Sequence, residues 1–379
     1  MSAASLPVAN SFAALPFNTP VRRLPRAPER KRAPEFTTAF DDRTLFYDCF
    51  RHAHGQRILM VGPAWVNLEA GYRLAKFVAM PSKTPLRVRF FPSLTTLVTE
   101  LVGAPTDTHS VEVTFAGERL VLAVQPSSAE TLRDRKLLFS INRDNDLAWI
   151  REWATFHAKV HGTDAVILFD NGSSRYEPAE VLATLQAVPG IAFAGVPSWP
   201  YSFGPIDRAV RKDPYWARFL QIGSMSVVLR RYGELAYGLL DCDIDELAGT
   251  RSGRSIYELA KASRGGLVAF RGIWIEATGG ARHRDFRMRL ADDKAALSRQ
   301  RKWALDPSRK WVRKLSVHPY WHWIEGRALF AKSMPEDALY WHFKGINTNW
   351  KEQRAQAPAE AGTLVEDQLL VSALEKLQD

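Results

Sequence analysis

Short apolar runs alternate with amphipathic stretches through the middle of the chain. Three of these runs, Lys136–Ile141, Ala165–Phe169 and Ile191–Val196, are short and largely continuous, which is typical of strands in a buried sheet. Residues 146–160 instead carry apolar side chains at helical spacing, and Gly162 follows them as a helix terminator. Strands and helices that alternate in this way predict βαβ units. We therefore expect an α/β fold with a mostly parallel sheet flanked by helices.

The N-terminal third of the chain has a different pattern. Between residues 43 and 130, short apolar runs alternate with turn residues such as Gly117 and Pro126, which predicts a small, mainly β module. This module holds no group of catalytic residue types, so we expect it to give structural support or to contact a partner. Residues 1–42 are rich in proline, and we interpret them as a flexible basic arm. The basic side chains of the arm include Arg22, Arg23, Arg26, Arg30, Lys31 and Arg32.

These patterns divide the chain into four parts. The arm covers residues 1–42, the β module covers residues 43–130, and the α/β domain covers residues 131–355. Residues 356–379 predict a C-terminal helix, because their apolar side chains recur on one broad face that can dock on the domain. No apolar run is long enough to span a bilayer.

Charge and composition narrow the class of protein. The chain has 379 residues, 46% of them apolar, and a formal net charge of +10. This apolar content is that of a folded protein with a core. The two cysteines, Cys49 and Cys242, exclude a disulfide framework and favour a reducing cytoplasm. We expect the basic arm either to be solvated or to make peripheral contact with the anionic inner face of a membrane.

The sharpest chemical feature follows an apolar strand. That strand leads into residues 241–246, which read DCDIDE and hold four acids in six positions. If the backbone stays extended, Asp241, Asp243 and Asp245 point to the same side. Carboxylates so close together repel one another unless a cation neutralises them, and Mg²⁺ or Mn²⁺ would leave positions open for phosphate oxygens. An acidic loop whose side chains reach into water is the alternative.

Polar residues also follow two earlier strands. Asp170 and Asn171 come directly after Ala165–Phe169, and Arg143 follows Lys136–Ile141. Ligands of open α/β sheets bind at the carboxyl ends of the strands. Asp170 can therefore accept hydrogen bonds from a base or ribose, and Arg143 can pair with a diphosphate. Asn171 equally suits a tight turn, and Arg143 equally suits an exposed loop.

The order of these features resembles the GT-A fold of glycosyltransferases. The shared features are a strand followed by NRDN, an amphipathic helix, a buried strand followed by DNGS, and an apolar strand followed by DxDxDEL, within residues 135–354. The chain is most similar to glycosyltransferase families 2 and 92 and to related bacterial polysaccharide and surface-glycan enzymes. The resemblance implies that Asp243 and Asp245 bind Mn²⁺ or Mg²⁺ with the donor diphosphate, that Asp241 binds the donor beside them, and that Asp170 and Asn171 contact the donor nucleotide.

The resemblance also implies roles for residues late in the chain. Such enzymes often add a histidine to the metal site, and His342 is the matching residue. A half-buried histidine in an aromatic cluster is the alternative. Lys344, Lys351 and Arg354 follow His342 and would contact the donor phosphates.

Inverting enzymes of this fold place a carboxylate base beyond the metal motif. Glu276 and Asp285 both lie there, and no motif decides between them. We therefore predict a metal-dependent, inverting glycosyltransferase that moves a hexose from a UDP- or GDP-sugar to a glycan or lipid-linked acceptor. Another metal-dependent nucleotide or phosphate enzyme could use the same acids, and a basic polyanion-binding scaffold is the other alternative. We expect no nucleic-acid partner, because basic and acidic residues are mixed outside the arm.

Overall fold

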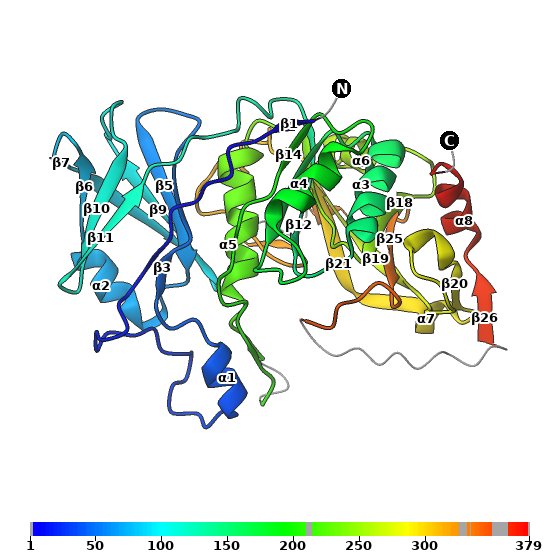
Figure 1. Cartoon of the computed structure of the whole chain (residues 1–379), viewed down its shortest axis with the longest axis horizontal. Coiled ribbons are helices and arrows are strands. Elements are labelled where there is room, and N and C mark those ends of the chain that lie inside the picture. The colour runs from blue at the N-terminus through cyan, green and yellow to red at the C-terminus, as the bar shows by residue number, and fades with distance from the viewer. Residues whose placement is uncertain (1–2, 210–213, 326–331, 334, 351–362, 378–379) are drawn as a thin grey trace.

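The computed structural model describes residues 3–209, 214–325, 332–333, 335–350 and 363–377. Its centre is a large sheet with helices on both faces (Figure 1). Its described strands lie in the order β1 (Ala4–Ser5), β14 (Phe193–Gly195), β13 (Ala165–Asp170), β12 (Lys136–Asn142), β17 (Gly238–Asp241), β21 (Leu297–Leu305), β19 (Leu267–Ile275), β25 (Ala338–Phe343) and β18 (Glu246–Thr250). A further strand, β24 (Lys332–Ser333), pairs with β19.

Most strand pairs of the large sheet are parallel. β1, β14, β13, β12 and β17 follow one another in the sheet, and each is parallel to the next. β21 runs antiparallel to both of its neighbours, β17 and β19, and β18 runs antiparallel to β25. The predicted α/β class with a mostly parallel sheet is therefore confirmed for the described residues. Because β12, β13 and β17 are parallel, their carboxyl ends meet at one edge of the sheet.

Helices cover both faces of the large sheet. One face packs against α3 (Leu147–His161), α4 (Pro178–Gln186), α6 (Ile256–Ala262) and α8 (Gln368–Glu375). α3 begins where the carboxylate of Asp146 accepts the N–H of Ala148 at 2.8 Å, and it ends at Gly162, whose φ of 68° is left-handed. The other face packs against α5 (Phe219–Val227), which continues into the π-helical turn Val228–Tyr232.

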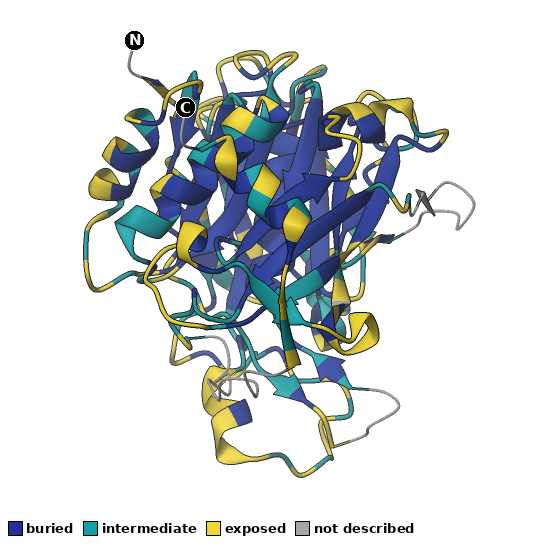
Figure 2. Ribbon diagram, turned by 90° about the vertical axis from the view of Figure 1, so that its right-hand side faces the viewer, coloured by how far each residue is buried: buried dark blue, intermediate teal, exposed yellow. Residues whose placement is uncertain are grey.

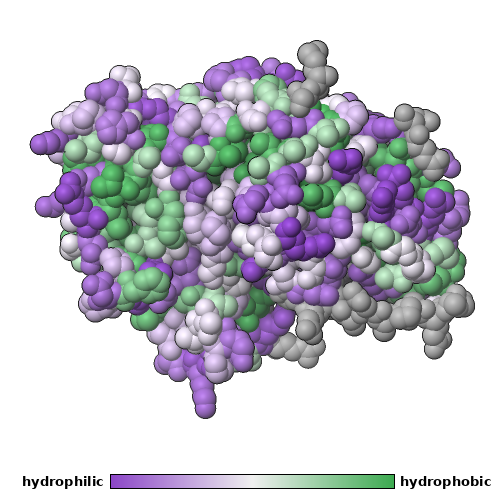
Figure 3. All heavy atoms as spheres, viewed as in Figure 1, coloured by the Kyte–Doolittle hydropathy of each residue, from purple (hydrophilic) through white to green (hydrophobic). Residues whose placement is uncertain are grey.

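The β module consists of two antiparallel sheets. The first has the order β4 (Asp48–Arg51), β5 (Arg57–Pro63), β9 (Thr96–Val102) and β8 (Arg87–Pro92), and the second β11 (Glu118–Ala123), β10 (Ser110–Phe115), β6 (Lys76–Met80) and β7 (Thr84–Pro85). Its predicted β character is thus confirmed. Hydrophobic side chains gather on the surface over these strands (Figure 3). The module's role in support or partner contact stays a prediction.

Several short elements complete the described part of the chain. They are β2 (Ala13–Ala14), α1 (Pro34–Ala39), β3 (Thr44–Phe46), a 3₁₀ turn (Val66–Leu68), α2 (Glu69–Leu74), β15 (Ile206–Asp207), β16 (Tyr215–Trp216), a second 3₁₀ turn (His283–Asp285), β20 (Met288–Leu290), α7 (Asp293–Ala296), β22 (His318–Pro319), β23 (Ile324–Glu325) and β26 (Leu364–Glu366). α8 lies within the predicted C-terminal region 356–379. None of the described helices combines the length and apolar character needed to cross a membrane.

The β module and the large sheet share one hydrophobic core. α5 lies between them (Figure 1), and apolar side chains from both parts belong to a single buried cluster. Gly223 of α5 faces the ring of Tyr47 so closely that a Cβ atom would lie 2.7 Å from it. Beside this contact, Arg231 and Asp48 form a buried ion pair at 2.9 Å. The strands of the large sheet are buried at the centre of the molecule (Figure 2).

The prediction that residues 1–42 form a flexible arm is wrong for the described residues. β1 adds a parallel strand to the edge of the large sheet. The buried guanidinium of Arg23 donates to three backbone carbonyls, and Arg30 and Arg32 both contact the carboxylate of Asp207. The segment can pack despite its positive charge, because backbone carbonyls solvate Arg23 and the carboxylate of Asp207 neutralises the charge of Arg30 and Arg32. Membrane contact through the arm stays a prediction.

Arg23→Met tests whether the arm is part of the folded core. The substitution leaves the buried carbonyls of Ala64, Asp41 and Thr44 without their donor, so we expect the free energy of unfolding to fall by about 3 kcal/mol or more. Urea denaturation measures this change. Lys31→Met is the matched control, because it removes the same charge from an exposed side chain, and its effect should stay within about 0.5 kcal/mol. Equal effects of the two substitutions would contradict the packed arm.

Two buried histidines of α3 make stability depend on pH. Burial lowers the pKa of His157 from 6.5 to about 3 and that of His161 from 6.5 to about 4. The unfolded chain binds protons at the ordinary value, so the free energy of unfolding should fall as the pH drops below 6.5, by about 2 kcal/mol for each histidine at pH 5.

Urea denaturation between pH 8 and pH 5 measures this dependence. His157→Gln should remove about 2 kcal/mol of the change at pH 5, because an amide does not titrate in this range. His109→Gln is the control, because His109 is exposed. A pH dependence that is identical in all three proteins would contradict the assignment.

Candidate functional site

The acidic segment forms a turn between two strands of the large sheet. We call residues 241–246 the acid turn: β17 ends at Asp241, and β18 begins at Glu246. The N–H of Asp243 donates to Glu246 Oε2 at 2.8 Å, and the N–H of Glu246 donates to the carbonyl of Asp243 at 3.0 Å. The expectation of an extended backbone with Asp241, Asp243 and Asp245 on one side is therefore wrong. Because the backbone turns here, the acids contact different partners: Asp243 contacts Lys302, and Asp245 contacts His342.

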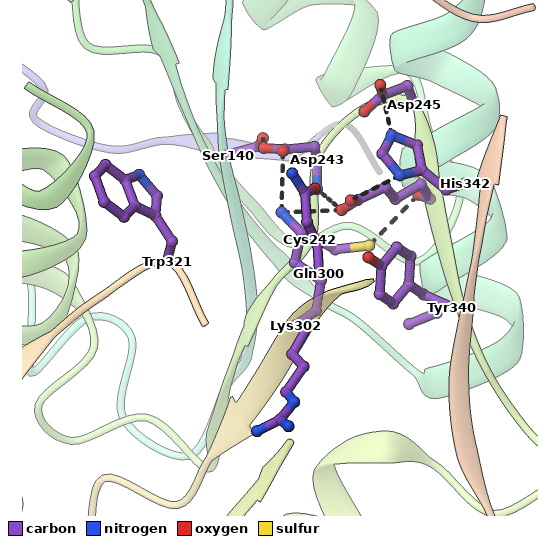
Figure 4. A network of polar contacts seen from close by, with 12 residues as sticks. Ser140, Cys242, Asp243, Asp245, Gln300, Lys302, Trp321, Tyr340 and His342 are labelled. Atoms are coloured by element: carbon purple, nitrogen blue, oxygen red, sulfur yellow. Dashed lines mark hydrogen bonds and ion pairs between the residues drawn. The ribbon is translucent and has the colours of Figure 1, made fainter. Parts of the chain in front are cut away.

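Lys302 of β21 neutralises one part of the acid turn. Its ammonium lies 2.9 Å from Asp243 Oδ2 and 3.0 Å from Glu246 Oε2 (Figure 4). Burial alone would lower the pKa of Lys302, but the carboxylates of Asp241, Asp243 and Glu246 raise it well above its usual value. Charge repulsion in the acid turn therefore does not by itself require a metal ion, because a side chain already supplies a cation.

Sequence reasoning missed Lys302. It lies far from the acid turn along the chain, and only strand pairing brings the two together. In the large sheet, Trp303 of β21 pairs with Asp241 of β17. The only local signal was a basic residue directly before the apolar positions Trp303, Ala304 and Leu305 of a strand.

Asp245, Glu246 and His342 form a second part of the site. The antiparallel pairing of β18 and β25 places Glu246 opposite His342. His342 Nε2 lies 3.1 Å from Asp245 Oδ2, and His342 Nδ1 lies 3.8 Å from Glu246 Oε1. The imidazole ring stacks on Trp274 with centroids 4.0 Å apart. One ligand atom from each of the three residues lies within 4.8 Å of the others.

This group has the ligand chemistry of a divalent metal site. Glu246 Oε1 is buried and accepts no hydrogen bond from the described residues. Burial also raises the pKa of Glu246, although Lys302 opposes that shift. A cation between the three side chains would contact this oxygen and stabilise the carboxylate. The structure thus brings together the predicted ligands Asp245 and His342 and adds Glu246, whereas Asp243 contacts Lys302 and accepts a hydrogen bond from Ser140 at 3.1 Å.

A cavity of about 320 Å³ adjoins both parts of the site. Asp243, Asp245, Lys302 and His342 line it at the carboxyl ends of β12 and β17. Figure 4 shows Trp321 across from these polar groups. The other lining residues are Ile141, Asn145, Arg208, Trp216, Arg218, Gln221, Ile244, Trp274, Gln300, His322, Ile346, Asn347, Thr348 and Trp350. The cavity therefore combines acids, cations and flat aromatic faces.

The two predicted base candidates lie outside the residues that line this cavity. Glu276 follows β19 and forms a bidentate ion pair with Lys344, with Nζ 2.7 and 2.8 Å from its two oxygens. Asp285 Oδ2 accepts the backbone N–H groups of Ala281 and Arg282, each at 2.9 Å, and so fastens its own loop. The catalytic roles of Glu276 and Asp285, and phosphate binding by Lys344, stay predictions.

The residues predicted to bind the donor nucleotide hold loops together. Asp170 Oδ1 accepts from Asn142 Nδ2 at 2.9 Å, and its Oδ2 accepts the N–H of Ser173 at 3.0 Å. Asn171 Nδ2 donates to the carbonyls of Trp199 and Tyr201 at 2.7 and 2.9 Å. Neither residue lines the cavity.

The remaining predicted donor-binding residues are Arg143, Lys351 and Arg354. The guanidinium of Arg143 lies 5.9 Å from the ring centroid of Trp350, a lining residue of the cavity. Lys351 and Arg354 fall outside the described residues. Donor binding by Asp170, Asn171 and these three residues stays a prediction.

Comparison with known proteins gives little independent information. No family model matches the chain, and no curated protein matches it. Solved structures that match include that of an active-site mutant of LgtC, a glycosyltransferase, at 19% sequence identity and a TM-score of 0.25. The match covers 47% of this chain and 59% of the LgtC chain, so it spans about three fifths of that protein. A TM-score this low assigns neither fold nor activity.

Lys302→Met tests whether this lysine holds the acid turn. The substitution leaves Asp243 and Glu246 without their cation, so we expect the free energy of unfolding to fall by about 3–5 kcal/mol. Urea denaturation measures the loss. Lys310→Met removes an exposed charge and should cost less than about 0.5 kcal/mol. Adding Glu246→Gln to Lys302→Met should restore part of the stability, and a further loss would contradict the proposed charge compensation.

Proposed function

We propose that the protein is a metal-dependent glycosyltransferase with a GT-A-like fold, which moves a sugar from a nucleotide-sugar to a hydroxyl acceptor. One observation carries this proposal. Asp245, Glu246 and His342 converge beside a cavity at the carboxyl ends of parallel strands, and the same cavity presents tryptophan rings. Carboxylate and imidazole ligands can hold a divalent cation, and flat apolar rings can stack on sugars.

The metal in this proposal is Mn²⁺ or Mg²⁺. Asp245, Glu246 and His342 would hold it, and the imidazole favours Mn²⁺, because Mg²⁺ binds mainly to oxygen. When bound, the metal would supply positive charge to the departing diphosphate. An imidazole that stacks on Trp274 is restricted in orientation, so the ligand geometry is set before the metal arrives.

The chain's own residues would carry out the remaining tasks. Lys302 keeps Asp243 fixed in the cavity wall and compensates the negative charge of Asp243 and Glu246, so that the acid turn repels the diphosphate less. Trp216 and Trp321, whose ring centroids lie 5.2 Å apart, offer flat faces for the sugar rings. We propose an inverting displacement in which Glu276 or Asp285 accepts the proton of the acceptor hydroxyl.

A second candidate is another metal-dependent nucleotide or phosphate enzyme. It would use the same three ligands, so the metal site does not separate the two functions. The tryptophan rings in the cavity disfavour a phosphate group alone as the substrate, because it gains nothing from a flat apolar surface. A nucleobase stacks on such rings as a sugar does, so the turnover experiment must separate a nucleotide enzyme from a glycosyltransferase.

Asp245→Asn and His342→Gln test the metal site. Each substitution removes one ligand, so we expect the affinity for Mn²⁺ to fall by about 10- to 100-fold, as measured by isothermal titration calorimetry. Asp107→Asn changes an exposed loop carboxylate in the same way and should leave Mn²⁺ binding unchanged. If both variants bound Mn²⁺ as tightly as the unmodified chain does, Asp245 and His342 would not be metal ligands.

The reaction itself is tested by turnover of UDP- and GDP-sugars with and without Mn²⁺. We expect slow Mn²⁺-dependent release of the nucleoside diphosphate from one of these donors even without an acceptor. We expect Asp245→Asn to lower this rate by about 10-fold or more at Mn²⁺ concentrations that half-saturate the unmodified chain, because less of the variant then holds the metal that compensates the leaving diphosphate. Turnover of nucleoside triphosphates in place of nucleotide-sugars would instead support the second candidate.

A further inference from the structure

A buried histidine contacts the backbone of the acid turn. His283 belongs to the loop between β19 and β20, and its side chain is fully buried. Its Nε2 lies 2.8 Å from the carbonyl oxygen of Ile244. A carbonyl oxygen only accepts hydrogen bonds, so Nε2 carries a proton and donates it. The contact therefore ties the acid turn to a loop that follows it by 39 positions in the chain.

This hydrogen bond fixes the peptide group directly before Asp245. A peptide group is planar, so the carbonyl of Ile244 and the N–H of Asp245 keep a fixed orientation to each other. The next carbonyl, that of Asp245 itself, accepts the N–H of Phe343 at 2.9 Å. Hydrogen bonds from His283 and Phe343 thus hold the backbone on both sides of the Asp245 Cα atom.

Two neighbours hold the imidazole of His283 in turn. Its Nδ1 lies 3.6 Å from Glu152 Oε2 of α3, and the ring of Phe343 meets it edge to face with centroids 5.1 Å apart. Burial alone would raise the pKa of Glu152, but His283 and Arg284 lower it, so Glu152 is a carboxylate at neutral pH. A negative charge beside Nδ1 and a ring against its edge restrict how the imidazole can rotate.

The loop that carries His283 is fastened to α3. Trp149 Nε1 donates to the carbonyl of Ala281 at 2.6 Å, and Arg284 forms an ion pair with Glu152. α3 packs against one face of the large sheet through its buried apolar side chains. These contacts give His283 a fixed position relative to the sheet, and with it to the acid turn.

A metal site gives this contact a use beyond packing. Ligands must be held within about 0.5 Å of their productive geometry for a metal to bind well. The pairing of β18 with β25 places Glu246 opposite His342 and so fixes two of the proposed ligands. Asp245 lies just outside β18, on the acid turn, and is not part of that pairing. Asp245 is therefore the ligand that depends most on support from outside the strands.

We propose that His283 is a positioning residue for the metal: its hydrogen bond to the carbonyl of Ile244 holds Asp245 in the direction that the cation requires. This inference rests on the metal site of the proposed function. It gives the loop between Glu276 and Asp285 a task in metal binding that needs neither of these carboxylates as a base.

His283→Met and His283→Gln separate the hydrogen bond from the volume of the side chain. Methionine fills a similar space without a donor, whereas the glutamine amide carries an N–H at a similar reach. We expect His283→Met to lower the Mn²⁺ affinity of the full chain by about 10-fold or more, and His283→Gln to keep it within about 3-fold, as measured by isothermal titration calorimetry. Glu152→Gln removes the charge beside Nδ1 and should lower the affinity in the same direction and by less.

His161→Met is the matched control for the loss of a buried histidine. His161 of α3 is also buried, and its Nε2 donates to the carbonyl of Ala248 at 2.9 Å, on β18 but outside the acid turn. We expect this variant to lose stability, as His283→Met does, but to keep its Mn²⁺ affinity. The electron paramagnetic resonance spectrum of bound Mn²⁺ is a second measurement, because it depends on the arrangement of the ligands. We expect it to change in His283→Met and to stay the same in His161→Met.

Three results would overturn the inference. His283→Met could bind Mn²⁺ as tightly as the unmodified chain does, His161→Met could lose as much affinity as His283→Met, or His283→Gln could bind as weakly as His283→Met. Should His283→Met not fold, unchanged Mn²⁺ affinity in Glu152→Gln would overturn it instead. Failure of the metal site itself is detected separately, because Asp245→Asn would then keep its affinity. If Asp245→Asn weakens Mn²⁺ binding and His283→Met does not, the proposed function stands and only the role of His283 is lost.

Discussion

A buried ammonium group determines the arrangement of the acid turn. Lys302 contacts Asp243 and Glu246, and Asp241 raises its pKa from nearby. Neither partner could occupy this position alone, because a buried charge without a counter-charge is far more costly than a paired one. The direction of β21 makes the contact. Since β21 runs antiparallel to β17, its early residues lie at the carboxyl end of β17, where the acids emerge.

The contacts of Lys302 divide the four acids of the acid turn into two groups, one beside the lysine and one beside His342. Asp241 and Asp243 are associated with the lysine, while Asp245 and His342 approach each other at the cavity. Glu246 belongs to both groups, because one of its oxygens contacts Lys302 and the other faces His342. A divalent cation at the second group would therefore be coupled electrostatically to Lys302 through a single carboxylate.

The cavity depends on parts of the chain that contribute little chemistry of their own. The shared core of the β module and the large sheet positions α5, and Gln221 of this helix lines the cavity. Asp170 and Asn171 contribute through hydrogen bonds that hold loops at the edge of the sheet. The side chains that line the cavity and those that hold its walls are thus separated along the sequence but adjacent in space.

The sequence alone determined the features that depend on local backbone preference. The C-terminal limit of α3 followed from Gly162, because left-handed backbone geometry acts within a few residues. The position of the acids at the end of a buried strand was likewise readable. Tertiary structure decided the rest: the turn of the acids, the ion pair with Lys302, the approach of His342 to Asp245 and the packing of residues 3–42. These features depend on strand pairing and loop contacts between residues far apart in the chain, and no local pattern records which distant charges will meet.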